Sequence, residues 1–403
     1  MSDATTLDTA AERRMRITVW RLFFCQALMQ ASVVGQVAMS GIVGASLSGS
    51  TFLATLPMAI QMLAVMLASI PAGMIFARFG RKAGFNMGAV ASLVGSLLFA
   101  SGVYQGSFLI YCIGSAFAGV GFGIAQHYRF AAAEVTPPAF RARSISLVMT
   151  GPIFSAVLGP ELVKGTFDLF PPFLFLPTYL CLAVLPLACL TLLAGTQLPA
   201  PPPRAKVATP VADIIARPAF VTAVVAGLVA YGTMNLLMTA TPLEMRLCGF
   251  ELTAPVTVIQ WHALAMFAPG FITGRLITRF GMRPVILAGV ALNMACVAVT
   301  LSGETFWHFI AGLMLLGVGW NFMFVGATAL LATSHSPQER IRAQTANDLI
   351  VFGTVACTAL LSGIVHDQLG WTAINIGVLP GLVVALALIA WQQRQASRKV
   401  QPA

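Results

Sequence analysis

The sequence predicts an all-α membrane protein with twelve transmembrane helices in two pseudo-symmetric six-helix bundles. Three observations support this fold class. The chain has 403 residues, of which 58% are hydrophobic and only 9% are charged, a composition outside the range of soluble domains. Apolar runs of about 20 residues or more, each long enough to cross the hydrocarbon core of a bilayer, recur along the whole length. Short loop motifs in the first half return in the second half.

The apolar runs place the twelve predicted helices. Charged residues are rare inside these runs, and polar, basic or Pro-rich stretches separate them. The predicted spans are residues 17–44, 50–76, 83–103, 107–133, 142–163, 172–195, 218–243, 255–277, 283–302, 305–332, 343–365 and 371–391.

A Pro-rich and basic segment divides the spans into two groups of six. It contains Pro199 and Pro201 to Pro203, followed by Arg204 and Lys206. The predicted organisation is a cytoplasmic tail at 1–16, a bundle at 17–195, a cytoplasmic linker at 196–217, a second bundle at 218–391 and a cytoplasmic tail at 392–403.

The distribution of charge predicts the orientation in the membrane. The net charge is +10, yet the basic residues concentrate in the loops of one face, and only Lys164 and Arg246 clearly fall on the other. This asymmetry is typical of the positive-inside rule, so both termini are expected in the cytoplasm and no nucleic-acid partner is expected. Acidic residues on the outer loops either attract cations or simply remain where bases are excluded. They are Glu161, Asp168, Glu244, Glu251, Glu304 and Asp367.

The N-terminus argues against a cleaved signal peptide, and the cysteines argue against a disulfide-bonded scaffold. Residues 1–16 are polar and basic, and the first apolar run is too long for a signal peptide, so no cleavable signal is expected. The seven cysteines lack a C-x-x-C pair and are expected to pack as small hydrophobic residues rather than form a disulfide framework. For Cys248, in a predicted outer loop, transfer of a soft metal ion is an alternative to packing.

Two loop motifs repeat between the halves. Residues 73–82 follow the second span as G-x-x-x-x-R-F-G-R-K, and residues 274–283 follow the eighth span with the same Gly, Arg, Phe and Gly. The segment from Pro138 to Arg143 in the first half has a counterpart from Pro337 to Arg342 in the second half. Such duplication indicates two related bundles with a substrate site near the midplane. The loop resembles the motif of the major facilitator superfamily, which implies that fold. The acid that usually precedes the arginine is replaced by Ala77 and Thr278.

Two soft-ligand motifs lie in the seventh and eighth spans. Met234-x-x-x-Met238 and His262-x-x-x-Met266 each place two side chains on one face of a helix. In antiparallel helices all four lie about 8–16 Å below the outer surface. Thioether and imidazole ligands without a carboxylate suit monovalent copper better than magnesium, calcium or manganese. Packing by methionine is the alternative, since the chain has 18 methionines, but a histidine at membrane depth favours function.

The paired motifs also carry a more specific resemblance. Their order, spacing and location are similar to those of the CcoA-like copper importers, a branch of the same superfamily. The resemblance implies that Met234, Met238, His262 and Met266 are the copper ligands and that the protein lies in the bacterial inner membrane. It also implies a supply of copper to cytochrome oxidase assembly, with copper chaperones or oxidase-assembly proteins as further partners beside copper and the lipid bilayer. Copper is then the transported substrate, and no cofactor is expected.

Two other transport functions remain alternatives. The broader family includes riboflavin transporters, so import of riboflavin or another organic nutrient is one. Proton-coupled efflux is the other, and it draws on Asp348 in the eleventh span and on a partial Gly-Pro pattern in the fifth. Asp348 is either a proton-coupling carboxylate or a salt-bridge partner for an arginine at the end of a span. No nucleophile elbow, P-loop or dinucleotide motif occurs, so an enzyme is not expected.

Three further polar or sulfur-containing features have open roles. The stripe Met58, Met62, Met66 is expected to pack, with a relay site for soft metal as the alternative. Arg129 either extends to the cytoplasmic surface or carries a gating charge. Asn235 either satisfies backbone groups or lines the cavity.

Overall fold

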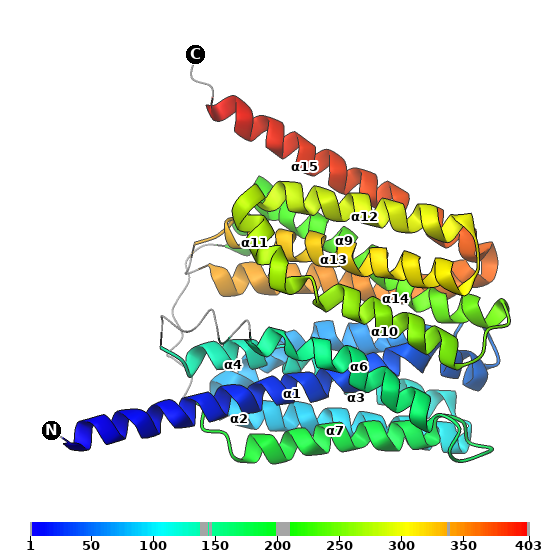
Figure 1. Ribbon diagram of the computed structural model, residues 1–403, viewed down its shortest axis with the longest axis horizontal. Coiled ribbons are helices and arrows are strands. Elements are labelled where there is room, and N and C mark those ends of the chain that lie inside the picture. The colour runs from blue at the N-terminus through cyan, green and yellow to red at the C-terminus, as the bar shows by residue number, and fades with distance from the viewer. Residues whose placement is uncertain (1, 138–143, 145–146, 199–209, 337–338, 401–403) are drawn as a thin grey trace. The chain divides into compact units, whose positions relative to one another are not determined.

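The computed structural model describes the whole chain except residues 1, 138–143, 145–146, 199–209, 337–338 and 401–403 (Figure 1). Every regular element in the described part is a helix. The helices are α1 (Ser2–Ser48), α2 (Leu56–Gln105), α3 (Phe108–Ala125), α4 (Tyr128–Glu134), α6 (Gly151–Thr166), α7 (Leu176–Ala194), α8 (Val211–Ile215), α9 (Pro218–Leu247), α10 (Thr253–Phe267), α11 (Gly270–Phe280), α12 (Met282–Ser302), α13 (Phe306–Ala332), α14 (Arg340–Gly377) and α15 (Leu379–Val400).

The predicted fold class is confirmed. Among the described residues, 10 helices are long and apolar enough to cross a membrane. The second predicted span lies in the part of α2 before Gly80, and the last two predicted spans lie in one stretch at Arg342–Gln392. That stretch has 51 residues, far more than the roughly 20 that one crossing requires. The backbone bends within it at Gly370, where φ is 79°.

The chain divides into two compact units. The first comprises Met1–Val37 and Leu63–Pro203, and the second comprises Ala38–Met62 and Arg204–Ala403. The end of α1 and the start of α2 thus belong with the second unit. Thr55 of this segment accepts a hydrogen bond from the Gly363 backbone N–H of α14 at 3.2 Å. Half of the predicted linker at 196–217, residues 199–209, lies outside the described residues, as does the loop at 138–143.

The repeated loop motif has the same backbone conformation in both halves. Gly80 has φ 81° and ψ 164°, and Gly281 has φ 89° and ψ 163°. Only glycine adopts this region without strain, because a Cβ atom would clash with the backbone. Each glycine breaks the helical path between two apolar helices, one inside α2 and one between α11 and α12.

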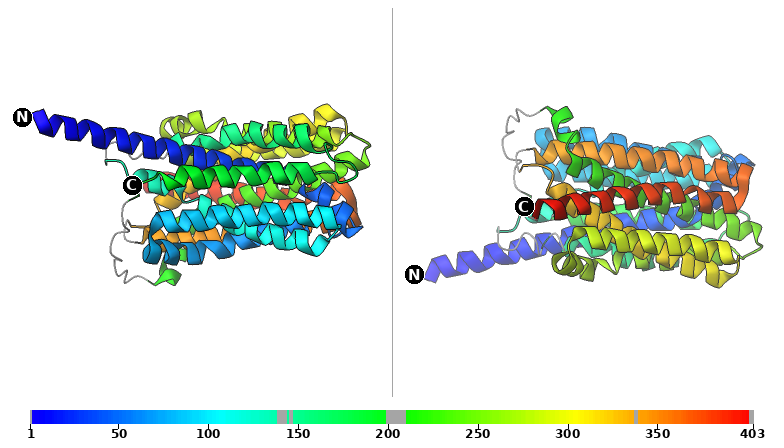
Figure 2. Two further views of the ribbon diagram at one scale, coloured as in Figure 1. Left: turned by 90° about the horizontal axis from the view of Figure 1, so that it is seen from below. Right: turned by 90° about the horizontal axis from the view of Figure 1, so that it is seen from above.

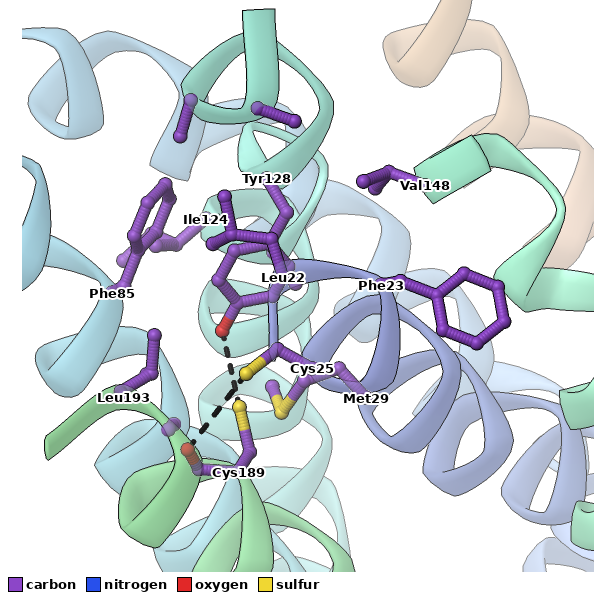
Figure 3. Close-up of a cluster of buried hydrophobic side chains, with 14 of the residues drawn as sticks. Leu22, Phe23, Cys25, Met29, Phe85, Ile124, Tyr128, Val148, Cys189 and Leu193 are labelled. Atoms are coloured by element: carbon purple, nitrogen blue, oxygen red, sulfur yellow. Dashed lines mark hydrogen bonds between the residues drawn. The ribbon is translucent and has the colours of Figure 1, made fainter. Parts of the chain in front are cut away.

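Helix α13 is central to the packing of the second unit. It packs against α9, α10 and α12, and α9 also packs against α14. These long helices run side by side (Figures 1 and 2). In the first unit, a buried core that includes Leu22, Phe85 and Tyr128 joins α1, α2 and α4 (Figure 3). Helix α13 thus contacts both helices that carry the predicted ligands.

Candidate functional site

The four predicted ligands are all buried in the second unit. Met234 and Met238 are 3% and 8% exposed on α9, and His262 and Met266 are 0% and 7% exposed on α10. Both motifs lie within continuous helix, as the sharing of one face by residues four apart requires. Helices α9 and α10 pack against each other. The structure therefore places two soft ligand pairs on neighbouring helices.

The imidazole of His262 is held in one orientation by a backbone carbonyl. Its Nδ1 lies 2.7 Å from the carbonyl oxygen of Leu313 on α13. A carbonyl oxygen only accepts hydrogen bonds, so Nδ1 carries the proton and donates it. The lone pair then resides on Nε2, which is buried and has no hydrogen-bond partner among the described residues.

This arrangement is typical of a histidine that binds a metal ion. A ligating imidazole usually donates its other N–H to a carbonyl or carboxylate, which sets the tautomer and aims the free nitrogen at the ion. A buried acceptor without a partner costs about 1–3 kcal/mol. A metal ion bound at Nε2 removes this cost. The Nε2 lone pair of His262 is therefore available to a metal ion that accepts it.

Helix α13 also fixes the backbone of the His262–Met266 turn. Gly317 lies so close that a Cβ atom there would be 2.7 Å from the His262 carbonyl oxygen and 3.0 Å from the Met266 backbone nitrogen. One turn later, the Asn321 side-chain amide donates to the Met266 carbonyl oxygen at 2.7 Å. Thr273 in turn donates to the side-chain oxygen of Asn321 at 2.6 Å. Contacts from α13 therefore hold the helical turn at both His262 and Met266.

The helix ends directly beside Met266 for a local chemical reason. Pro269 lies two residues after Phe267, the last residue of α10, and has no N–H to continue the hydrogen-bond ladder. The Asn321 amide supplies a donor for the Met266 carbonyl at this break. A broken helix with its carbonyls satisfied by a neighbour is a common feature of transporter binding sites.

On the other helix, side-chain hydrogen bonds hold α9 against α14. The Asn235 amide donates to the Val355 carbonyl oxygen at 3.0 Å, and Ser362 donates to the Leu236 carbonyl oxygen at 2.8 Å. Of the two predicted roles for Asn235, satisfaction of a backbone group is the one observed. The two ligand pairs are thus positioned by different neighbours, α14 and α13. Their convergence on a single ion stays a prediction.

A second group of polar side chains lies at the end of α9. The sulfur of Cys248 is 3.7 Å from a carboxylate oxygen of Glu244 and 3.8 Å from one of Glu304. The ligand atoms of these three residues lie within 4.8 Å of one another, and the His366 Nε2 lies 2.7 Å from a Glu244 carboxylate oxygen. Partial burial and then the two carboxylates raise the pKa of the Cys248 thiol to about 11. The structure thus gathers two of the predicted outer acids around Cys248.

The remaining polar and sulfur features keep open roles. Met58 and Met62 are buried at 3% and 5%. The Asn347 amide donates to Asp348 at 3.1 Å, and Arg129 lies 3.7 Å from the sulfur of Met149. None of these contacts distinguishes a functional role from a structural one.

Sequence reasoning missed the residues that position the ligands. Leu313, Gly317 and Asn321 follow the His262 motif by about 50 residues, and no spacing connects them to it. Pro269 was the one visible signal, because a proline three residues after Met266 predicts a helix break.

Comparisons with known proteins cover both halves of the chain. A family model described as Major Facilitator Superfamily matches residues 223–403, and one described as Sugar (and other) transporter matches residues 12–192. The chain is 38% identical to the Riboflavin transporter RfnT of Brucella anthropi over 96% of each chain. It is 26% identical to the MFS-type transporter YddS of Bacillus subtilis, over 94% of this chain and 91% of that protein.

Proposed function

This chain belongs to the major facilitator superfamily and is a multi-pass membrane transporter, and we propose that it imports copper across the bacterial inner membrane. Both termini lie in the cytoplasm in this proposal. Met234, Met238, His262 and Met266 bind the ion, which is transported in its monovalent state. Alternating exposure of the site to the two sides of the membrane carries the ion inward.

The observation that carries the proposal is the orientation of His262. Its Nδ1 is engaged by the Leu313 carbonyl, so the buried Nε2 presents a lone pair without a partner. The other three candidate ligands are thioethers, and a set of thioethers and one imidazole favours Cu(I) over harder cations. A site with few ligands also suits transport, because the ion must leave as readily as it enters.

The copper is delivered to the assembly of cytochrome oxidase in this proposal. That assignment comes from the resemblance of the two motifs to those of CcoA-like importers. Copper is the cargo, so the protein needs no resident cofactor. Copper chaperones or oxidase-assembly proteins are the expected partners on the receiving side.

Uptake of radioactive copper into cells tests the proposal. Met234→Leu removes a thioether with little change in volume, and His262→Gln removes the imidazole. Each variant should lower uptake at limiting copper by about tenfold, the effect of roughly 1.4 kcal/mol of lost binding. Met245→Leu is the matched control, because Met245 is buried on α9 outside the motif. Wild-type uptake by both variants at equal protein abundance would rule out the four-ligand site.

Import of riboflavin is the second candidate function. It is favoured by the 38% identity to a protein named as a riboflavin transporter, over almost the full length of both chains. Growth of a riboflavin-requiring strain that expresses this protein tests it. Growth that persists in the Met234→Leu and His262→Gln variants, combined with unaffected copper uptake, would favour riboflavin as the cargo.

A further inference from the structure

Three sulfur atoms converge in the core of the first unit. Cys25 and Met29 lie on α1 and Cys189 lies on α7, and their side chains are 0%, 2% and 0% exposed. Figure 3 shows their sulfur atoms pointing into one space between the two helices. Cys25 and Met29 are four residues apart, so they share a face of α1.

The two thiols are in direct contact with each other. The Cys25 thiol lies 3.9 Å from the Cys189 carbonyl oxygen, and Figure 3 shows its sulfur beside that of Cys189. The Tyr128 hydroxyl is 3.3 Å from the Cys189 sulfur (Figure 3). The surrounding residues of this core, such as Leu22, are apolar. A pair of contacting thiols with a thioether beside it therefore forms a compact group of soft donors in an apolar setting.

Two cations lie near this group, at the end of α7. Arg21, one turn before Cys25 on α1, donates to the Gly195 carbonyl oxygen. Lys82 donates to the Ala194 carbonyl oxygen at 2.7 Å. Cys189 is five residues before Ala194, which corresponds to about 8 Å along the helix. Arg21 also interacts electrostatically with Cys25. Positive charge is thus available to offset negative charge that develops on the thiols.

We propose that Cys25, Cys189 and Met29 form a second metal site, which takes a soft monovalent ion such as Cu(I). Thiolate and thioether sulfur are the ligands that Cu(I) prefers. On binding, the ion displaces the proton of each thiol and forms a bond to each sulfur, and the two protons leave to solvent without any change of oxidation state. The complex carries one net negative charge, which the Arg21 guanidinium offsets.

The site goes beyond the proposed function, because its residues all lie in the first unit and the transport ligands lie in the second. Its occupancy by copper is measured by binding and does not require transport. The two proposals can therefore fail separately.

Titration of the purified, reduced full-length protein with Cu(I) against a chromophoric chelator tests the site. The Cys25→Ser/Cys189→Ser double variant should bind one Cu(I) fewer per chain than the wild type. Cys112→Ser is the matched control, since Cys112 is also buried in the first unit and should leave the stoichiometry unchanged. An unchanged stoichiometry in the double variant would overturn the proposal.

A second measurement does not alter the cluster and so avoids any folding defect there. The Met234→Leu/His262→Gln variant keeps all three sulfur residues, and it should retain one Cu(I) whose X-ray absorption spectrum shows only sulfur neighbours. Met29→Leu should weaken this binding by about tenfold while the thiols remain. Loss of all bound copper in the Met234→Leu/His262→Gln variant, or nitrogen neighbours in its spectrum, would refute the site.

Discussion

Substitution of Gly317 by alanine should displace the His262 turn without touching any predicted ligand. The added Cβ atom would lie 2.7 Å from the His262 carbonyl oxygen, whereas ordinary contact begins at 3.4 Å. The neighbouring atoms are mostly backbone of α10, so they cannot rotate away as a flexible side chain would. Helices α10 and α13 must therefore separate by about 0.7 Å, which stretches the hydrogen bond between His262 and Leu313.

Two opposing contributions determine the free-energy cost of this separation. Overpacking of a tight interface costs about 1–3 kcal/mol, and the higher helix propensity of alanine returns about 1 kcal/mol. A net loss of about 1 kcal/mol at the ligand turn corresponds to a several-fold weaker affinity for copper. We expect Gly317→Ala to lower copper uptake at limiting concentration by about three- to tenfold, with a smaller effect at saturating copper.

A matched glycine on α9 provides the control. A Cβ atom at Gly227 would lie 3.9 Å from its nearest neighbours, so Gly227→Ala adds helix propensity without a clash. Radioactive copper uptake, normalised to the amount of protein in the membrane, should be unchanged in this variant. If Gly317→Ala transports copper with the wild-type concentration dependence, the reasoning that α13 positions His262 is wrong.

Two further predictions concern the loop residues of the second unit. The raised pKa of Cys248 makes its thiolate scarce at pH 8, so maleimide should label this residue slowly. Glu304→Gln removes a negative charge beside the thiol, which lowers the pKa of Cys248 and should raise its labelling rate, as followed by mass spectrometry across pH. Gly281→Ala forces a Cβ atom into a backbone region that costs of order 1–3 kcal/mol, so it should lower thermal stability in detergent, whereas Gly274→Ala in open space should not.

Each of these two expectations has a clear contrary result. A labelling rate for Cys248 that Glu304→Gln leaves unchanged would mean that the carboxylate does not act on the thiol. Equal thermal stability of Gly281→Ala and Gly274→Ala would mean that the turn tolerates a different backbone path.

The helical fold and its internal repeat could be predicted because both depend on local sequence. The repeated loop motif correctly marked Gly80 and Gly281 as equivalent, and both have the same positive φ. The division of the last two spans was predictable as well, since the gap between the predicted spans 343–365 and 371–391 contains Gly370, where the backbone leaves the helical conformation.

The candidate site was predictable in part. Spacing alone placed Met234 and Met238 on one helix face, and likewise His262 and Met266, and all four are buried. The partners that orient these side chains come from another helix. No pattern within α10 indicates that the Leu313 carbonyl accepts a hydrogen bond from Nδ1 of His262. The sequence therefore does not reveal that Nε2 lacks a partner.

The amino-acid sequence is enough to establish that this chain crosses the membrane repeatedly as helices, because a span needs only about 20 apolar residues and satisfies its own backbone hydrogen bonds. It also determined which soft side chains share a helix face. Which atoms meet between helices becomes visible only in the folded structure. The Cys25 and Cys189 thiols are 164 residues apart in the chain, and they touch because α1 and α7 pack in one particular rotation. Contacts of that kind depend on the relative rotation and depth of two helices, which the spacing within either helix does not specify.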